Sequence, residues 1–239
     1  MFGSPIKFGK LGKFPELVRD LIKILLLSKY YAKKCFEKVF FVTFAFESKA
    51  LFFMTTYETV ESGKLLLAEP FLDDPYFRRA VILLTQHQSW GTIGFILNRP
   101  LEDVLVHQFA PLPEVDLPLY YGGPVATSTL HFIHSAGDLV DDSVLIGEKL
   151  WWGGNFEQLK FLLTSKLLPK DEVRFFVGYS GWDAGQLKGE FDEKTWIVAA
   201  MDKNYLHKFP AEALWSSILK HQSDALAVIA DMPVENRFN

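Results

Sequence analysis

The sequence predicts an α+β domain built on a largely antiparallel sheet. Short apolar runs typical of strands are interspersed with segments that have the periodicity of amphipathic helices. The first two clear strands are joined by a link short enough for an antiparallel hairpin. The strict β-α-β alternation of a doubly wound parallel sheet is missing, which favours the α+β class.

The first strands are predicted from apolar runs that end in turn residues. Lys64–Ala68 is a short apolar run, and Asp73-Asp74-Pro75 reads as a turn or a helix start. Ala80–Thr85 is apolar and partly β-branched, which indicates a buried strand. Gly91–Leu97 is the second strand of the hairpin, and Asn98-Arg99-Pro100 ends it.

The middle of the chain is predicted to hold one short helix and one strand. Leu101–Phe109 has apolar residues at helical spacing, and Ala110–Pro118 is a proline-rich loop. Leu119–Tyr121 leads into the tight break at 122–124, and Thr129–His134 is the next strand.

The last third is predicted to add two helices and two strands. Asn155 is a good N-cap for a helix over Phe156–Lys166. We expect strands at Val173–Tyr179 and Thr195–Ala200, separated by a glycine-rich stretch over Ser180–Gly189. A final helix opens at Pro210 with a buried stripe of Leu214, Trp215, Ile218 and Leu219, and the last ten residues form a loose tail.

Composition excludes several classes of protein. The 239 residues are 49% hydrophobic and 23% charged, as expected of a folded globular chain rather than a disordered or fibrous one. A single cysteine, Cys35, rules out an intramolecular disulfide and a multi-thiolate metal site. The net charge of -4 argues against a strongly basic nucleic-acid binder.

The charge is distributed unevenly, which predicts a boundary near residue 53. Residues 1–53 carry a net charge of +6, and residues 54–239 carry -10. The first segment fits three interpretations: a targeting segment, an interfacial amphipathic helix, or an upstream region translated ahead of a true start at Met54. We favour the last, and expect 54–239 to form one domain. No apolar run in 1–53 reaches the roughly 20 residues needed to span a bilayer.

Four peptide blocks carry a resemblance to a known family. They are Gly91–Pro100 (GTIGFILNRP), Tyr121–Val125 (YGGPV), Trp152–Asn155 (WGGN) and Gly178–Leu187 (GYSGWDAGQL). In order and spacing they resemble the AlgH/YqgE family of bacterial proteins, and Leu65–Arg79 is similar to that family's start. The resemblance covers about residues 63–220 and does not extend into 1–53.

The resemblance implies a barrel-like, mainly antiparallel sheet with flanking helices. It implies little about activity: members are often labelled transcriptional regulators, but the family pattern includes no DNA-binding motif or catalytic mechanism. Ser180 stands where members usually have Ala, which weakens any proposal of a serine nucleophile.

The first candidate binding residues lie at the end of the predicted hairpin. Asn98 places a polar side chain there, and the Arg99 guanidinium could bind an anion or carboxylate through two parallel hydrogen bonds. The competing interpretation, which we rank higher, is an internal ion pair between Arg99 and an acid. Gly122 and Gly123 could present backbone N–H groups to a phosphate, although a tight structural turn explains them better.

The block at 178–187 supplies the remaining candidates. Gly178-Tyr179-Ser180-Gly181-Trp182 resembles the nucleophile elbow G-x-S-x-G, but Trp182 replaces its last glycine. Tyr179, Trp182 and Gln186 could line a small-molecule pocket, with Gly181 allowing close backbone approach. The structural alternative is a glycine-rich loop held by a buried tryptophan.

The sequence gives little support for a metal site or for a pair of catalytic acids. His131 and His134 have odd spacing, which places them on opposite faces of a strand, so we predict no metal site. Adjacent acids such as Asp73-Asp74 are more simply solvated turns than convergent catalytic pairs.

We therefore expect a cytoplasmic binding domain for a small molecule or a protein, with an indirect regulatory role and no cofactor. A hydrolase or transferase that uses the glycine-rich loops is the alternative, and a transcriptional regulator is the second. No residue set combines nucleophile, base and orienting group, so catalytic residues are unassigned. The excess of acids in 54–239 opposes direct DNA binding. We expect the four blocks to converge at one end of the sheet, with Arg99 beside Asn98, Gly123, Tyr179 and Trp182.

Overall fold

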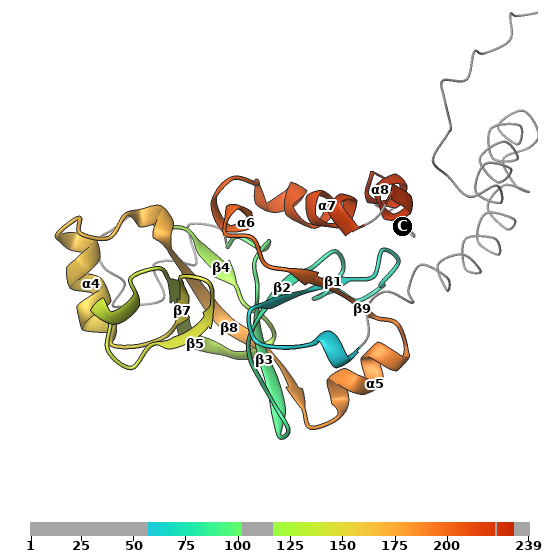
Figure 1. Cartoon of the computed structure of the whole chain (residues 1–239), viewed down its shortest axis with the longest axis horizontal. Helices are drawn as coiled ribbons and strands as arrows, with labels where there is room; N and C mark the ends of the chain where they lie inside the picture. Colours follow the sequence, from blue (N-terminus) through green and yellow to red (C-terminus); the bar gives the residue numbers. More distant parts are fainter. Residues whose placement is uncertain (1–56, 102–116, 223, 232–239) are drawn as a thin grey trace, which may run out of the picture. The chain divides into compact units, whose positions relative to one another are not determined.

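The computed structural model of the chain describes residues 57–101, 117–222 and 224–231. Nine strands form one mainly antiparallel sheet in the order β6-β7-β5-β8-β3-β2-β1-β9, and β4 pairs with β8 outside this path (Figure 1). The strands are β1 (Lys64–Ala68), β2 (Val81–Gln88), β3 (Gly91–Ile96), β4 (Leu119–Tyr121), β5 (Val125–His134), β6 (Val144–Gly147), β7 (Leu150–Trp152), β8 (Val173–Asp183) and β9 (Trp196–Ala200).

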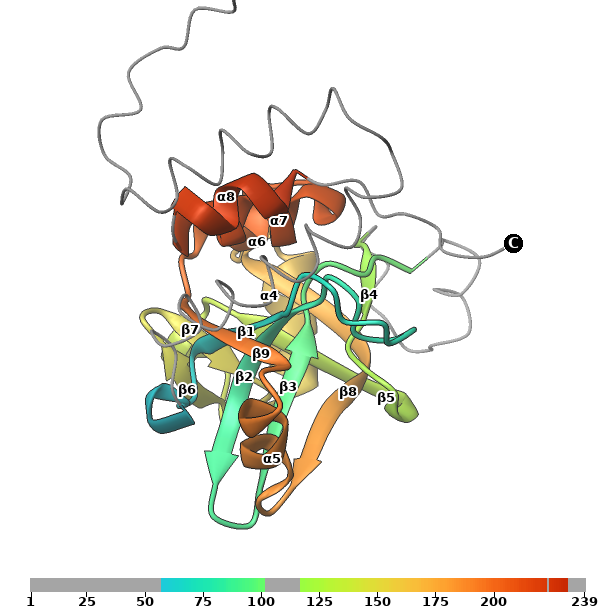
Figure 2. The same cartoon turned by 90° about the vertical axis from the view of Figure 1, so that its right-hand side faces the viewer.

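Strand β8 holds the two parts of the sheet together. Its last residues pair antiparallel with the first residues of β3, from Gly91↔Asp183 to Gly94↔Ser180. Its earlier residues pair antiparallel with β5 and parallel with β4, the one parallel pairing among the described strands. Figure 2 shows β8 running beside β3 and β5. The predicted antiparallel sheet is therefore confirmed.

The sheet is curved but not closed. Its order ends at β6 and β9, although the carbonyl of Ile146 in β6 lies so close to Gly63 that a side chain on Gly63 would overlap it. The term "barrel-like" therefore applies only loosely.

Helices flank the sheet as expected. The α-helices are α4 (Phe156–Thr164), α5 (Gln186–Asp192), α6 (Asn204–His207), α7 (Ala211–Gln222) and α8 (Asp224–Ala230). Three 3-10 turns lie at Tyr57–Thr59, Gly137–Leu139 and Lys170–Glu172. Asn155 caps α4 as predicted, because its side chain accepts hydrogen bonds from the backbone N–H groups of Glu157 and Gln158.

The helices cover separate parts of the sheet. Helix α5 adds Leu187 and Phe191 to a core cluster that includes residues of β1, β2, β3 and β9, while α4 packs against β5 and β8. Helix α7 buries the predicted stripe, and the indole N–H of Trp215 donates to the carbonyl of Ala68 at 2.9 Å. Figures 1 and 2 show α7 and α8 together over the β1–β2–β9 part of the sheet.

The central strands are buried on both faces, which explains their continuous apolar sequence. Leu66 and Ile82 belong to the cluster beneath α5, yet Leu65 and Leu83, which alternate with them, also have no exposed surface. A strand covered on both sides has no polar face and so loses period-two alternation.

The structure corrects several boundaries. The expected glycine-rich stretch over 180–189 is instead the end of β8 followed by α5, because the β3 backbone supplies hydrogen-bonding partners to residues 180–183. The short strands β4, β6 and β7 and helices α6 and α8 were not predicted. The predicted helix at 101–109, nearly all of the 110–118 loop and the C-terminal tail lie outside the described residues.

Candidate functional site

A segment of the chain itself lies against two of the four sequence blocks, Gly91–Pro100 and Gly178–Leu187. This segment, residues 69–79, connects β1 to β2 and is called the 69–79 loop below. Its Phe77 ring stacks on Trp182 with centroids 6.4 Å apart. Its last two carbonyls, those of Arg78 and Arg79, accept hydrogen bonds from Arg99 and Asn98. Residues expected to bind a ligand therefore hold a loop in place.

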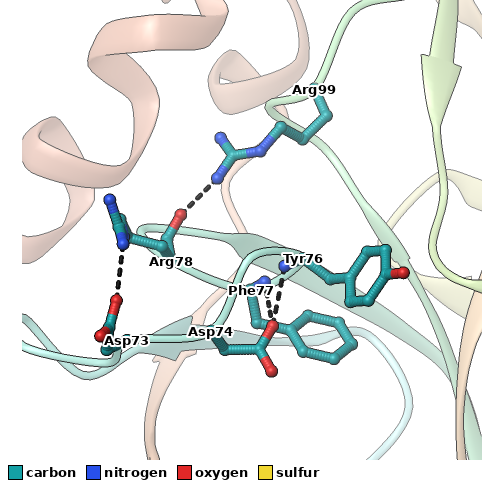
Figure 3. Close-up of polar contacts among 6 residues, drawn as sticks. All are labelled: Asp73, Asp74, Tyr76, Phe77, Arg78 and Arg99. Carbon is teal, nitrogen blue, oxygen red and sulfur yellow. Dashed lines mark hydrogen bonds and ion pairs between the residues drawn. The ribbon is translucent and has the colours of Figure 1, made fainter. Parts of the chain in front are cut away.

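Local sequence explains the shape of this loop. The Asp74 side chain accepts hydrogen bonds from the backbone N–H groups of Tyr76 at 2.8 Å and Phe77 at 2.9 Å, which closes a turn at Pro75 (Figure 3). Asp73 and Arg78 form an exposed ion pair of 2.6 Å across the same turn. The turn that Asp73-Asp74-Pro75 predicts is thus present.

Asn98 joins the loop to β2. Its side chain is buried, with 4% of its surface exposed, and its amide makes two hydrogen bonds. The amide oxygen accepts from Val81 N–H at 2.9 Å, and the amide nitrogen donates to the Arg79 carbonyl at 2.9 Å. Arg79 has a positive φ of 53°, an unfavourable conformation for a residue other than glycine. Asn98 therefore fixes a strained backbone position.

Arg99 contacts backbone rather than an acid. Its guanidinium donates to the Asn98 carbonyl at 3.3 Å and to the Arg78 carbonyl (Figure 3). No carboxylate contacts it in the part of the chain that the structure describes, so the expected ion pair to an internal acid is wrong for these residues. Partial burial lowers the pKa of Arg99, because removal of water disfavours its charged form.

All four arginines within 57–101, 117–222 and 224–231 gather around residues 97–99. Arg78 and Arg79 are joined to this turn by the hydrogen bonds described above. Arg174 donates to the Leu97 carbonyl at 3.0 Å and to the Leu206 carbonyl, and its guanidinium lies 4.3 Å from the centre of the Tyr120 ring. Burial lowers the pKa of Arg174 too. Arg78 and Arg79 meet this turn through their backbone carbonyls, and the Arg79 guanidinium lies 4.9 Å from the centre of the Trp215 ring. Among the described arginines, the guanidiniums that contact residues 97–99 are those of Arg99 and Arg174.

The glycines of the second block have a packing role. A side chain on Gly122 would overlap the carbonyl of Gly178, and one on Gly123 would overlap the backbone of Tyr179. The Gly122 N–H also donates to the Val177 carbonyl at 2.8 Å, and the Gly122 carbonyl accepts from the Ile96 N–H at 3.0 Å. The glycines thus let β4 cross close to β8, which favours the structural interpretation over a phosphate-binding nest.

Trp182 and Gln186 converge on Glu190 in α5. One Glu190 oxygen accepts hydrogen bonds from the indole N–H groups of Trp182 at 2.8 Å and Trp196 at 2.6 Å. The other accepts from the Gln186 amide at 3.0 Å, and the Gln186 amide oxygen accepts from the Asp183 N–H at 3.1 Å. The polar groups of both predicted binding residues are thus used within the fold.

Tyr179 belongs to a different group of rings. It meets His131 edge to face at 5.8 Å, and His131 lies 5.2 Å from Phe95. A Cβ on Gly181 would lie 3.0 Å from the Tyr179 ring, so Gly181 makes room for it. The Trp152 ring, in the third block, lies 6.1 Å from the Phe95 ring.

The hydroxyl and imidazole groups considered for chemistry are engaged. Ser180 is fully buried and donates to the Gly122 carbonyl at 3.0 Å, which leaves its oxygen unavailable as an exposed nucleophile. His134 is also fully buried, and its Nε2 lies 3.0 Å from the Gly153 carbonyl oxygen. The Nε2 of His131 lies 2.9 Å from the Thr129 hydroxyl oxygen. The described ranges contain no group of three or more His, Cys, Asp or Glu residues placed to hold a metal ion.

The residues expected to form one site lie at opposite ends of strand β3. Asn98 and Arg99 follow the end of β3, and the Arg99 carbonyl accepts from Tyr121 N–H at 2.7 Å, next to Gly122. Trp182 instead pairs with Thr92 near the start of β3. The blocks therefore do not all meet at one end of β3: Gly123 lies against Tyr179, whereas Trp182 lies beside the start of the strand.

Sequence reasoning missed three residues that organise these sites. Asp74 shapes the loop, Glu190 binds two indoles, and Arg174 supplies a buried cation. Asp74 carried a signal in its position before Pro75. Arg174 was recognisable as a charge inside an apolar strand, but neither it nor Glu190 shows its partners in the sequence.

Comparisons with known proteins agree on one family. A family model described as AlgH-like matches residues 65–227. A UPF0301 protein of Chlorobium phaeobacteroides is 39% identical over 177 residues, which cover 74% of this chain and 95% of that protein. A UPF0301 protein of Chlorobium luteolum is 41% identical and covers 74% and 94%.

Solved structures show the same fold. The solution structure of the AlgH protein from Pseudomonas aeruginosa matches with a TM-score of 0.59 at 26% identity, covering 75% of this chain and 97% of that one. A crystal structure of a Corynebacterium diphtheriae protein matches with a TM-score of 0.64 at 24% identity, covering 76% and 97%. Among the described residues, no helix is long and apolar enough to cross a membrane.

Proposed function

Because the chain belongs to the AlgH-like family, a membership that shows its fold but no reaction, we propose that it acts as a binding domain. The partner is a small molecule or a protein, recognised by the outward side of the 69–79 loop, and any regulatory role follows indirectly from this binding.

One observation carries the proposal: the loop is held from within and displays side chains outward. Asn98 and Arg99 fasten its end, and Phe77 packs on Trp182. On the outer side, Tyr76 is 51% exposed and the Arg78 side chain is 43% exposed. A rigid segment that displays an aromatic ring and a guanidinium loses little conformational entropy on binding, and these residue types dominate binding hot spots.

The neighbouring Tyr121 adds a polar group to this surface. Burial and the nearby charges of Tyr76 and Asp74 raise the pKa of the Tyr121 phenol, which keeps it protonated near neutral pH. The phenol can therefore donate a hydrogen bond beside the aromatic ring of Tyr76. This combination suits a partner that presents both an apolar group and a hydrogen-bond acceptor.

The test begins with native mass spectrometry of the full chain purified from its own cells, followed by titration of any co-purified molecule or partner. Wild type is compared with Tyr76→Ala, Arg78→Ala and the control Trp90→Ala, since Trp90 is 61% exposed in the β2–β3 turn. We expect binding to weaken about tenfold or more in the loop variants and to persist in the control.

Equal affinity in all four proteins would contradict the proposal, as would a partner whose contacts lie elsewhere on the fold. Turnover of the bound molecule would favour the enzyme alternative, and sequence-specific binding of a DNA fragment would favour direct regulation.

A further inference from the structure

We infer that Arg99 and Arg78 form a binding site for an oxyanion, a phosphate or carboxylate group of the ligand. This inference rests on the proposed function, because it specifies the chemistry recognised at the end of the same loop. Three observations support it: no described side chain neutralises the charge of Arg99, its contacts with described residues use only part of its hydrogen-bonding capacity, and the partner of Arg78 is exchangeable.

The charge of Arg99 is not neutralised by any described side chain. Its two hydrogen-bond acceptors among the described residues are backbone carbonyls, and the same holds for Arg174, which contacts the Leu97 carbonyl. A partly buried cation normally has an anionic partner, because removal of water makes a lone charge costly. An anion at this position would therefore be bound more strongly than at an exposed lysine.

Arg99 also has donors left for a ligand. A guanidinium carries five N–H groups, and the two hydrogen bonds to Asn98 and Arg78 leave part of this set unused by the described residues. The planar fork matches two oxygens of a carboxylate or phosphate, which a lysine cannot match. Because Asn98 is buried and hydrogen-bonded to the loop, the backbone of the next residue, Arg99, is held in a fixed place.

Arg78 supplies a second cation whose present partner is replaceable. Its guanidinium bonds Asp73, whose side chain is 89% exposed, so this ion pair is solvated and weak. The Arg99 guanidinium contacts the carbonyl of Arg78, so it lies beside the backbone from which the Arg78 side chain extends (Figure 3). In the unliganded chain Asp73 occupies a guanidinium that an incoming oxyanion would take over.

The test measures binding of inorganic phosphate and of malonate to the full chain, with chloride at the same ionic strength as the reference. The readouts are the midpoint of thermal unfolding and the arginine side-chain N–H signals in a nuclear magnetic resonance spectrum. We expect either anion to raise the midpoint above that in chloride, and to shift the signals of Arg99 and Arg78 but not that of Arg174. Comparing the effect of phosphate with that of malonate shows whether the site prefers a phosphate or a carboxylate group.

Three variants sharpen the test. Arg99→Gln should weaken anion binding about tenfold or more, as expected for loss of a charged hydrogen-bond donor. Asp73→Asn should strengthen it, because Arg78 is released. Lys188→Gln, which removes an exposed charge in α5, should leave it unchanged. If Arg99→Gln does not fold, Arg99→Lys keeps the charge without the fork and should still bind more weakly.

The inference is overturned if phosphate and malonate act no differently from chloride, or if Lys188→Gln weakens binding as much as Arg99→Gln. It is also overturned if the wild-type spectrum shifts at Arg174 alone. Loss of anion binding with intact Tyr76-dependent partner binding would refute this site and leave the proposed function standing. The reverse result would refute the proposed function only.

Discussion

Replacing Asn98 with alanine should be among the most destabilising single changes in the described part of the chain. The substitution removes two buried hydrogen bonds of 2.9 Å, and it leaves the N–H of Val81 and the carbonyl of Arg79 without their partner. Each buried backbone group left unsatisfied costs about 1–3 kcal/mol, so the expected loss is roughly 2–6 kcal/mol. The strained φ of Arg79 would relax at the same time, which moves the true value toward the lower end.

The assay is urea unfolding of the full chain, followed by far-ultraviolet circular dichroism, with Asn155→Ala as the matched control. Asn155 also makes two hydrogen bonds to backbone N–H groups, at 3.1 and 3.2 Å, but at an exposed helix cap. Loss of such a cap costs about 1 kcal/mol. A value for Asn98→Ala no larger than that of Asn155→Ala would refute the claim that burial of the amide fixes the loop.

Three further predictions follow from other contacts. Burial lowers the pKa of His134, so at pH values below about 6.5 the unfolded state binds the proton before the folded state does. The free energy of unfolding should therefore fall as the pH drops below that value. Urea titrations at several pH values measure this fall, and His134→Gln should make the free energy of unfolding depend less on pH. Glu190→Ala should lower the free energy of unfolding by roughly 1–3 kcal/mol and shift the tryptophan fluorescence, because the indole N–H groups of Trp182 and Trp196 lose their acceptor. An unchanged emission spectrum would contradict the contact that the two indoles share. A chain of residues 54–239 should unfold cooperatively without 1–53, and an insoluble or molten product would count against the boundary.

Much of the fold could be predicted because it is encoded locally. The cap at Asn155, the stripe containing Trp215 and the hairpin before Asn98 each depend on residues within a few positions of one another. The end of β8 could not be predicted this way. Its glycines suggest a loop, and only the distant partner β3 makes residues 180–183 a strand.

The candidate site was harder to predict because its contacts join distant parts of the chain. Sequence reasoning selected Asn98, Arg99 and Trp182, and all three do contact one structure, the 69–79 loop. It assigned them to a ligand because nothing in residues 98–182 reveals that an earlier segment fills the space beside them. The Glu190 contact was missed for the same reason.

The placement of β8 has a consequence for the order of folding during synthesis. Its partner β3 begins at Gly91, while the residue paired with Gly91 is Asp183, so the ribosome must add about ninety residues before this ladder can form. Until then the hairpin of β2 and β3 has an unpaired apolar edge, and β1 also waits for β9. Such sheets fold slowly, and their incomplete forms expose surfaces on which chains associate. The β3 edge of the nascent chain therefore stays without its β8 partner until about residue 183 has been made.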